Sequence, residues 1–461
     1  MDEDAAAGRR RGTVAGAHAV TSTDVVVIGA GCAGLSAATT LVEAGARVVV
    51  VEARPIAGGR TFATEDRSTG DWVDNGQHVL FGCYYDTLAH LSRIGTRQKL
   101  MVQSSLAVPM VDMNGRQSEL RCPALPSPLQ LVAGALAWDA LTWRERLAIT
   151  GLGRALRRSA PPPPPDQTVR AWLTRHGQPA RLCDLLWEPL AVAALNQPID
   201  QATATTFVEV VRRMLGPGSD DAALVIPAES LTHVLVDPAV KFIEAGGGEV
   251  RRGAPARVSV GPGGVAGVEV RGQVVTAPVV VSSAPWHALA GLFAPMPEVL
   301  VPLATRAAAM QSVPIVTVNL WFDRPVLGRP FVGLPGRAFQ WVFDKRRVSP
   351  GQATHLSLVC SGATDVVGLD NDAIVERAHR ELAAAVPAAS RARLVRATAV
   401  RERRATFSLA AGEPARPACV TPLPGFLLAG DWTDTGLPAT IESAVSSGHR
   451  AAKAALAFLR T

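Results

Sequence analysis

The chain has 461 residues, of which 48% are hydrophobic and 19% are charged. A chain of this length holds about three domains, and this balance excludes intrinsic disorder or a coiled coil as its main state. The net charge is +6, and only four of the 46 basic residues are lysines. Such a charge permits contact with an anionic membrane surface without requiring it. The arginines are dispersed and no recognition motif accompanies them, so we expect no nucleic acid partner.

Six cysteines are scattered along the chain without a C-x-x-C pair. This spacing disfavours a zinc site and a disulfide framework, so we expect no bound metal and a reducing, cytoplasmic setting. Near the N-terminus, three arginines at 9–11 are not followed by an apolar segment, which argues against a signal peptide. We expect residues 1–22 to form a disordered leader.

The first regular elements are a strand, a glycine turn, a helix and a second strand. Four of residues 24–28 are apolar and β-branched, which predicts a buried parallel strand. A helix of small residues then ends at Gly45, and residues 47–51 are a second buried strand. A hydropathy window could assign the uncharged stretch 25–42 to a membrane helix. The glycine spacing within this stretch favours a buried strand and helix instead.

The rest of the chain alternates between helical and strand patterns. A helix is predicted at 86–94, a mostly helical region with a polyproline spacer at 100–230, short antiparallel strands at 249–282, strands at 312–322, 355–360 and 426–429, and a last helix from about 440. These elements predict an α/β fold in which one nucleotide-binding domain is interrupted twice by a mixed α+β domain. The expected parts of the first domain are 23–99, 231–300 and 416–461, and those of the second are 100–230 and 301–415.

The glycines of the first turn carry the strongest local signal. Gly29-x-Gly31-x-x-Gly34 lies between a strand and a helix, and Glu52 ends the next strand 18 residues after Gly34. Gly29 allows the tight turn, Gly31 lets the backbone approach a pyrophosphate, and Gly34 permits close helix packing. The helix N-terminus stabilises the phosphates, and Glu52 accepts hydrogen bonds from the adenosine ribose. The segment therefore predicts a bound dinucleotide.

The residues after Glu52 distinguish a flavin from a nicotinamide dinucleotide. Arg54, Gly58, Gly59 and Arg60 follow in the pattern E-A-R-x₃-G-G-R. This pattern resembles the flavin-binding signature of the amine oxidase and phytoene desaturase superfamily. The resemblance implies a Rossmann-like FAD-binding domain in which the two glycines let the backbone pass beside the cofactor and Arg60 brings a cation to the pyrophosphate.

A second flavin motif lies near the C-terminus. Gly430-Asp431 ends an apolar strand, and a helix follows from Thr440. This arrangement resembles the second flavin motif of the same superfamily, which implies that the carboxylate of Asp431 faces the ribityl chain and the helix N-terminus faces the flavin. Gly76 and Val258 are further cofactor-binding candidates. No cysteine stands where a covalent flavin link is expected, so we expect the FAD to be non-covalent.

Two features decide between the branches of this superfamily. Its amine oxidases usually carry a lysine in a strand of the substrate domain, facing the flavin N5. By local pattern that strand is Ile315–Phe322, where Thr317 takes the lysine position and no lysine is near. The two tyrosines, Tyr84 and Tyr85, are adjacent rather than placed as an aromatic cage. Both departures count against amine oxidation.

The segment Asp74–Tyr84 reads DNGQHVLFGCY and closely resembles the D-N-G-Q-H…G-C-Y stretch of the hydroxysqualene dehydroxylases. Further matches to that family are Leu190–Asn196, Arg403–Phe407 and Gly430–Glu442. The resemblance implies that hydroxysqualene loses its allylic hydroxyl as water and that reduced FAD delivers hydride, giving squalene for hopanoid synthesis. A lipophilic polyisoprenoid of this size needs a long apolar tunnel, and the apolar middle segments suit one.

Loss of a hydroxyl needs an acid, and carboxylates or ring faces can stabilise the allylic cation that results. Asp74, Gln77 and His78 are candidates for the acid and for orienting the hydroxyl. His78 could equally well bond the flavin or a backbone carbonyl. Glu188 and Asn196 are weaker candidates: Glu188 has a raised pKa if it is buried between its Trp and Pro neighbours, and otherwise it is a solvated helix terminus.

Other functions stay open at this point. The chain could be a desaturase or oxidase of another isoprenoid or of an amine, or a flavin-binding protein without catalysis. Membrane contact is a separate hypothesis, because Thr142–Arg158 interleaves five arginines with tryptophan and aliphatic residues. This pattern is typical of a basic amphipathic helix at a membrane surface, although an ordinary helix with a solvated arginine face would also show it. We expect a cytoplasmic protein with peripheral contact to the inner face of the cytoplasmic membrane.

Overall fold

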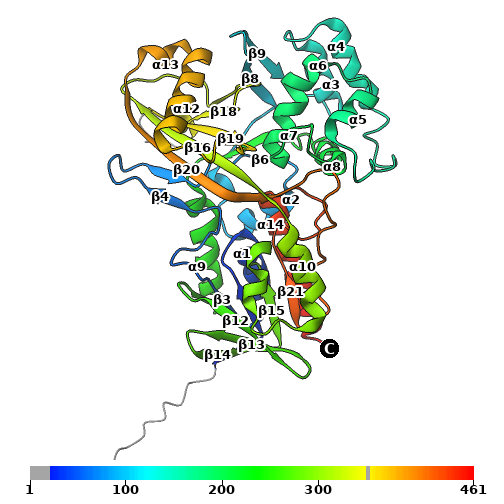
Figure 1. Ribbon diagram of the computed structural model, residues 1–461, viewed down its shortest axis with the longest axis vertical. Helices are drawn as coiled ribbons and strands as arrows, with labels where there is room; N and C mark the ends of the chain where they lie inside the picture. The colour runs from blue at the N-terminus through cyan, green and yellow to red at the C-terminus, as the bar shows by residue number, and fades with distance from the viewer. Residues whose placement is uncertain (1–20, 349–353) are drawn as a thin grey trace, which may run out of the picture.

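Two β-sheets organise residues 21–348 and 354–461, the parts of the chain that this computed structural model describes. A five-stranded sheet forms the centre of the lower half in Figure 1, and a seven-stranded sheet crosses the upper half. Both the N-terminal β2 and the C-terminal α14 lie in the lower half, whereas the middle of the chain builds most of the upper half. The predicted α/β fold, with an interrupted Rossmann-like domain, is confirmed.

The five-stranded sheet is parallel and has the order β11-β3-β2-β15-β21. Its strands are β2 (Val25–Ile28), β3 (Val48–Val51), β11 (Glu249–Arg251), β15 (Val279–Ser282) and β21 (Phe426–Leu428). The central strands consist of valine and isoleucine, apart from Ser282 at the end of β15, and are buried along their whole length, as expected when helices or other strands cover both faces. The sheet therefore unites the first, middle and last parts of the sequence.

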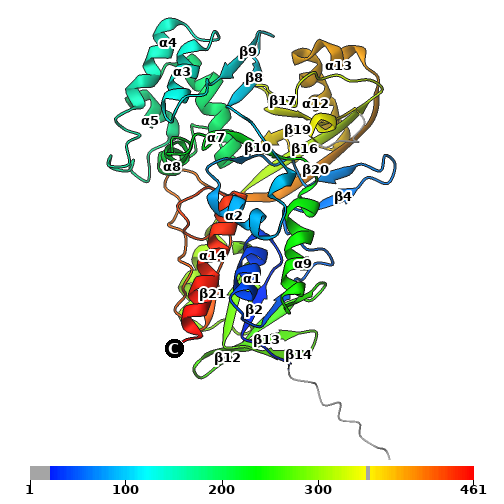
Figure 2. The same ribbon diagram turned by 180° about the vertical axis from the view of Figure 1, so that it is seen from behind.

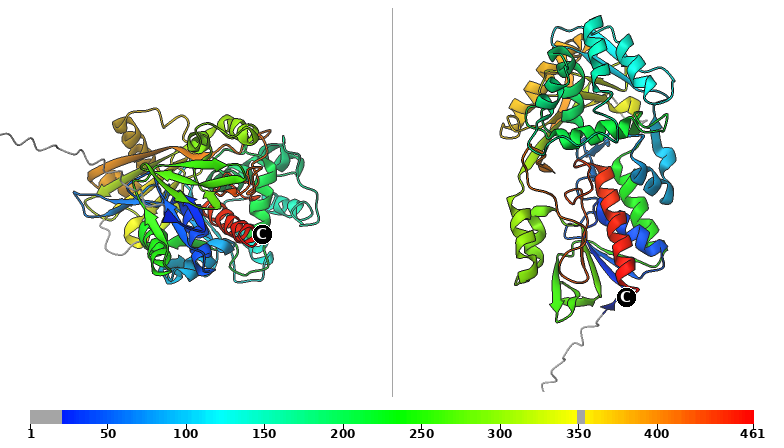
Figure 3. Two further views of the ribbon diagram at one scale, coloured as in Figure 1. Left: turned by 90° about the horizontal axis from the view of Figure 1, so that it is seen from below. Right: turned by 90° about the vertical axis from the view of Figure 1, so that its right-hand side faces the viewer.

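Three helices lie side by side on one face of this sheet: α14 (Ile441–Phe458), α1 (Cys32–Glu43) and α9 (Asp237–Ala245) (Figure 2). Gly448 allows α14 to approach α1 closely, because a Cβ atom there would overlap with Ala33 O and Ser36 Oγ. The antiparallel strands β12 (Ala256–Gly261), β13 (Gly264–Val270) and β14 (Gln273–Thr276) lie at the lower end of the domain, and α10 (Val301–Ala309) lies on the far side of the sheet from α14 (Figure 3).

The structure corrects three predictions about these elements. Thr21–Ser22 forms β1 and pairs with β14, so the predicted leader 1–22 ends in a strand, and its residues 1–20 lie outside the described residues. The strands predicted at 249–282 are not all antiparallel, because β11 and β15 join the parallel sheet. The region 100–230 is helical only in its middle: strands β7 (Leu100–Val102), β8 (Ala107–Val111), β9 (Gln117–Arg121) and β10 (Leu224–Pro227) occupy its ends.

The seven-stranded sheet has the order β20-β16-β19-β18-β17-β8-β9. Its remaining strands are β16 (Ser312–Phe322), β17 (Phe331–Gly333), β18 (Trp341–Asp344), β19 (His355–Ser361) and β20 (Leu394–Phe407). Alternate residues of β16, namely Val316, Val318 and Leu320, pack under α12 (Asn371–Ala385) in one core. Because successive side chains of a strand point to opposite faces, the residues between them face the other side of the sheet, where the cavity described below lies.

Helices and short strands complete the upper half and its junction with the lower half. They are β4 (Ala63–Glu65), β5 (Trp72–Asp74), β6 (Leu80–Phe81), α2 (Tyr85–Arg93), α3 (Leu129–Ala137), α4 (Trp143–Ala148), α5 (Val169–Arg175), α6 (Ala180–Leu182), α7 (Glu188–Leu195), α8 (Ala204–Met214), α11 (Lys345–Val348) and α13 (Pro387–Arg391). Within the described ranges, no helix is both long and apolar enough to cross a membrane.

Candidate cofactor and active site

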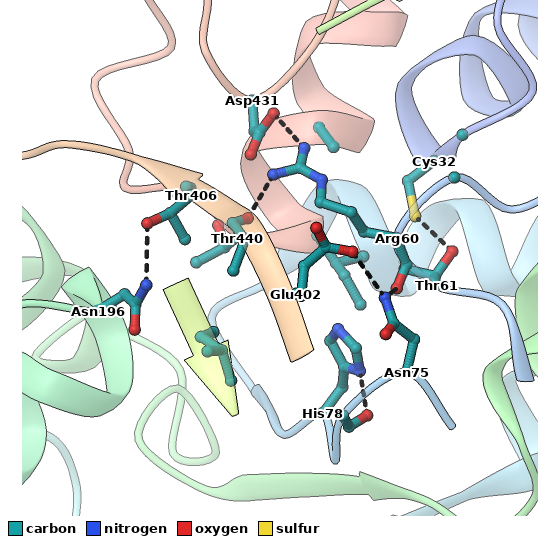
Figure 4. A pocket seen from close by; sticks show the side chains of 18 of the residues that line it. Cys32, Arg60, Thr61, Asn75, His78, Asn196, Glu402, Thr406, Asp431 and Thr440 are labelled. Atoms are coloured by element: carbon teal, nitrogen blue, oxygen red, sulfur yellow. Dashed lines mark hydrogen bonds and ion pairs between the residues drawn. The ribbon is translucent and has the colours of Figure 1, made fainter. Parts of the chain in front are cut away.

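A cavity of about 1250 Å³ lies where the two halves meet. It is lined by the glycine turn and β3 of the parallel sheet, by the loop 75–79, by one face of the seven-stranded sheet, and by α7. Figure 4 shows its polar part, where side chains from β20, from the N-terminal segment and from the start of α14 gather. The cavity thus has a polar end at the glycine turn and an apolar end.

The glycine turn presents backbone to the cavity. Gly29 has a φ of +97°, which favours glycine, and its N–H donates to Val51 O. Gly31 lines the cavity and pairs with Gly58 of the second glycine motif. Gly34 permits the close packing expected of it, because a Cβ there would overlap with Gly29 O. The turn and the N-terminus of α1 thus stand together at the place where the motif predicts a pyrophosphate.

Glu52 and Arg54 fix the adjoining loop. The Glu52 carboxylate accepts hydrogen bonds from the backbone N–H of Ala30 and of Arg54, each at 2.8 Å. Arg54 also donates from Nη1 to Gly59 O at 3.1 Å. Glu52 lines the cavity, and each of its oxygens retains a second lone pair for a ribose hydroxyl. Glu52 therefore holds two loops together, a role that the sequence does not reveal.

Arg60 and Asp431 meet across the cavity. Nη2 of Arg60 lies 2.6 Å from Oδ1 of Asp431, and its Nη1 donates to Ala405 O at 2.6 Å. The two predicted flavin motifs, 371 residues apart, are therefore joined by one ion pair. Gly430, with a φ of +127°, lines the cavity beside them. Thr440 caps the N-terminus of α14, where it accepts a hydrogen bond from the backbone of Ser443 and lines the same end of the cavity.

These residues fit FAD. A backbone turn at a helix N-terminus suits the pyrophosphate, Glu52 suits a ribose, and the start of α14 supplies partial positive charge near the ring system. Val258 is buried in β12 and does not line the cavity, whereas residues 254–256 do. Cys32 lines the cavity, but burial raises the pKa of its thiol to about 11. A protonated thiol is a poor nucleophile, which suits a cofactor held without a covalent bond.

The loop after β5 holds the first catalytic candidates. Asp74 does not line the cavity; its Oδ1 accepts from the backbone N–H of Leu231 at 3.0 Å, and its Oδ2 lies 3.3 Å from Nζ of Lys345. Nζ of Lys345 also donates to Oε1 of Gln77 at 2.8 Å. Asp74 and Gln77 therefore hold this loop in place through a buried lysine. The sequence does not predict a lysine beside Asp74 and Gln77, because Lys345 is distant from them along the chain.

We expect that replacing Lys345 with methionine lowers the free energy of unfolding by about 3–5 kcal/mol, because the Asp74 carboxylate is left buried without a cation. The side chains of Lys345 and Asp74 are only 5% and 9% exposed. Urea unfolding monitored by circular dichroism measures the loss. The matched control is Lys99→Met, which breaks the exposed pair with Glu229 and should cost less than about 1 kcal/mol. If the two variants lost equal free energy of unfolding, the stabilising role of the buried pair between Lys345 and Asp74 would be contradicted.

His78 lines the cavity with a defined tautomer. Its Nδ1 lies 2.9 Å from Gly76 O, and because a carbonyl only accepts, Nδ1 carries the proton. Burial lowers the pKa of the imidazole, so the ring is neutral near pH 7 and Nε2 is an acceptor for a ligand. Gly76 itself has a φ of +97° and lies close to Thr317, which lines the cavity at the position predicted for a lysine in amine oxidases.

The apolar end of the cavity runs across the seven-stranded sheet. Thr317 lies opposite Val400 of β20 and Val359 of β19, and Val359 lies opposite Trp341 of β18. All four residues line the cavity, and the lining continues across β17, β8 and β9 through Phe331, Met110 and Leu120. Six inter-strand spacings of about 4.8 Å give this wall a width of about 29 Å.

Helix α7 forms the facing wall. Its lining residues recur at helical spacing and are small or apolar: Leu186 just before the helix, then Pro189, Leu190, Ala193 and Ala194. Asn196 follows in the left-handed region with a φ of 57°. Its side chain donates to Thr406 Oγ1 at 3.0 Å and accepts from Gly362 N at 2.6 Å. Asn196 therefore anchors α7 to the sheet, and this explains its place in the sequence motif.

Two carboxylates lie at places that the sequence does not predict. Glu188 has a raised pKa because it is buried, but its Oε2 accepts from the backbone N–H of Ile199 at 2.9 Å and the residue does not line the cavity. Glu402 of β20 does line the cavity, and the sequence analysis missed it. Its position next to the motif Arg403–Phe407 was the feature that could have indicated Glu402. In the structure it lies on the same strand face as Val400.

Comparisons with known proteins agree with this site. The model of the family described as flavin containing amine oxidoreductase matches residues 32–456. Hydroxysqualene dehydroxylases of Sinorhizobium fredii and Rhodopseudomonas palustris are 31% and 32% identical to this chain, each over 95% of it and 99% of the relative. A 15-cis-phytoene desaturase of Narcissus pseudonarcissus is 29% identical over 93% of this chain and 79% of the relative.

Solved structures show the same fold at low identity. An oxidoreductase from Methanosarcina mazei superposes with a TM-score of 0.73 over 93% of this chain and 100% of that one, at 18% identity. Arg60, Asp431 and the start of α14 lie in the segment that the family model covers, and this segment begins within the glycine turn, at residue 32. The chain therefore belongs to the flavin containing amine oxidoreductase family and is an FAD-dependent oxidoreductase.

Proposed function

We propose that this protein catalyses the FAD-dependent removal of the allylic hydroxyl of hydroxysqualene, giving squalene. The observation that carries the proposal is the apolar wall of about 29 Å, from six spacings of about 4.8 Å, which starts beside the polar loop of His78 and ends at β9. A lipophilic polyisoprenoid suits such a wall. The similarity to hydroxysqualene dehydroxylases over nearly the whole chain supports the same substrate class.

The residues of the chain supply orientation and exclusion of water. FAD held by Glu52, the glycine turn and the start of α14 would, in its reduced form, supply the hydride for the carbon that loses its hydroxyl. Nε2 of neutral His78 accepts a hydrogen bond from the substrate hydroxyl, while Nδ1 stays bonded to Gly76 O. Asp74 and Gln77 keep this loop fixed through Lys345. The side chains of the sheet and of α7 keep water from the reacting carbon.

Anaerobic reoxidation tests the proposal. Purified protein with reduced FAD should be reoxidised by hydroxysqualene, and squalene should appear in equal amount by mass spectrometry. A polyprene without a hydroxyl should leave the reduced flavin unchanged. If hydroxysqualene fails to reoxidise the flavin and a more saturated polyprene instead bleaches the oxidised flavin, the protein is a desaturase.

The desaturase is the second candidate, and one observation favours it: phytoene desaturases match this chain almost as well as the dehydroxylases do. Oxidation of an amine is less well supported, because Thr317 stands where amine oxidases usually carry a lysine and the cavity wall beside it is apolar. Hydrogen peroxide formation with simple amines would show that activity directly.

We also propose that the protein collects its substrate at the inner face of the cytoplasmic membrane. The predicted helix Thr142–Arg158 is wrong: α4 ends at Ala148, and a single 3₁₀ turn and bends follow. The surface nevertheless exposes Leu129 of α3, and Trp143 and Leu147 of α4, beside several arginines. Vesicles with anionic lipid should bind the protein at low salt and release it at high salt. If the vesicles do not bind the protein at low salt, the proposal that this surface contacts the membrane is wrong.

A further inference from the structure

Glu402 lies at the boundary between the polar and apolar ends of the cavity. It sits on β20 opposite Ile315 of β16, and both residues line the cavity. Its Oε2 accepts a hydrogen bond from Nδ2 of Asn75 at 3.2 Å, and its Oε1 accepts from the backbone N–H of Arg404 at 3.3 Å. The strand and the loop before His78 therefore fix its carboxyl group from two sides.

The other carboxylates that line the cavity, among the described residues, have different partners. Glu52 bonds the backbone of the glycine loops at the nucleotide end, and Asp431 is paired with Arg60. Glu402 is thus the acidic side chain that borders the apolar wall. Figure 4 shows it grouped with Asn75 and His78, next to Arg60. A substrate hydroxyl that contacts Nε2 of His78 would lie in this group.

We propose that Glu402 is the acid that protonates the departing hydroxyl, an inference that rests on the proposed dehydroxylation. The proton leaves the Glu402 carboxyl for the hydroxyl oxygen, the C–O bond breaks with both electrons remaining on oxygen, and water departs. The allylic cation left behind faces the newly formed carboxylate, whose charge stabilises it. The bound reduced flavin would supply the hydride that the carbon then needs, and solvent returns a proton to Glu402.

Paired substrates test this role in the FAD-loaded protein. Glu402→Gln should lower the rate of flavin reoxidation by hydroxysqualene by about 100-fold or more, the range found for loss of a general acid. The allylic chloride of the same carbon chain needs no proton for its leaving group. It should therefore reoxidise the variant about as fast as it reoxidises the original protein. A chloride rate as low as the alcohol rate, or an unchanged alcohol rate, would overturn the assignment.

Binding to the oxidised protein gives a readout other than activity. Glu402→Gln should retain FAD and bind squalene as the original protein does, because the apolar wall is intact. The surface variant Glu376→Gln, which alters only an exposed pair with Arg380, should leave every rate unchanged. If the original protein consumes neither alcohol nor chloride, the proposed function fails and this inference fails with it. Loss of FAD or squalene binding in Glu402→Gln would instead show a structural role and overturn the inference.

Discussion

Replacing Ala193 with tryptophan is expected to lower turnover of hydroxysqualene by about 100-fold or more, while FAD binding stays unchanged. Ala193 lines the cavity from α7 and is exposed, so an indole there can extend into the space without overpacking a core. An indole at this position would fill part of the cavity that α7 lines. The substrate would then lose its contact with the wall beyond Val359 and Trp341.

The measurement is the rate of anaerobic flavin reoxidation, with the flavin absorbance as the check on cofactor content. The matched control is Ala384→Trp, on the exposed side of α12 and away from the cavity. That variant should react at the original rate. Normal turnover by Ala193→Trp would show that the substrate does not pass between α7 and the sheet.

Replacing Gly34 with alanine is expected to yield protein that has lost FAD. The added Cβ would overlap with Gly29 O and lie 2.6 Å from Oγ of Ser283. The carbonyl belongs to the backbone of the turn, so relief of the overlap must move Gly29 and Gly31 relative to α1. Overpacking of this kind costs about 1–3 kcal/mol or more, and about 2.7 kcal/mol lost from binding is a 100-fold lower affinity.

The FAD content is measured from the ratio of flavin to protein absorbance after gel filtration, and the melting temperature by calorimetry with added FAD. Gly368→Ala is the control, because that exposed glycine has open space around it and needs no positive φ. Gly368→Ala should keep the FAD content and the melting temperature of the original protein. A yellow Gly34→Ala protein with the original melting temperature would show that the turn can adjust, and that the geometry of the glycine motif is less strict than the overlap implies.

The parts of the fold that depend on local pattern could be predicted from the sequence. The strand at 25–28, the turn at Gly29 and the helix that ends near Gly45 follow one another along the chain, and each is specified by its own residues. Pairing between distant strands could not be predicted in the same way. β11 and β15 lie next to antiparallel strands in sequence yet join the parallel sheet, because burial against partners that are distant along the chain decides their place.

In the candidate site, too, the local residue pattern could be predicted from the sequence, whereas contacts between distant residues could not. The residue types of both flavin motifs indicated a cofactor, but not that Arg60 and Asp431 form an ion pair with each other. Asp74 looked like an acid because its neighbours are polar, whereas its partner Lys345 lies 271 residues further along the chain. Glu402 was missed because nothing in its local pattern shows which face of the strand borders the cavity; that follows from the pairing of β20 with β16.

The ion pair between Arg60 and Asp431, together with strand β21 and helix α14, has a consequence for biosynthesis. One wall of the cofactor cavity comes from residues between 430 and 444, which are synthesised long after the glycine turn and β3. The parallel sheet cannot be completed until β21 has been made, even though its first strands emerge early, because β15 pairs with β2 on one side and with β21 on the other. The complete site for FAD therefore forms only after this segment has been made, and we expect a polypeptide that terminates before Phe426 to bind FAD more weakly because it lacks Asp431 and the start of α14.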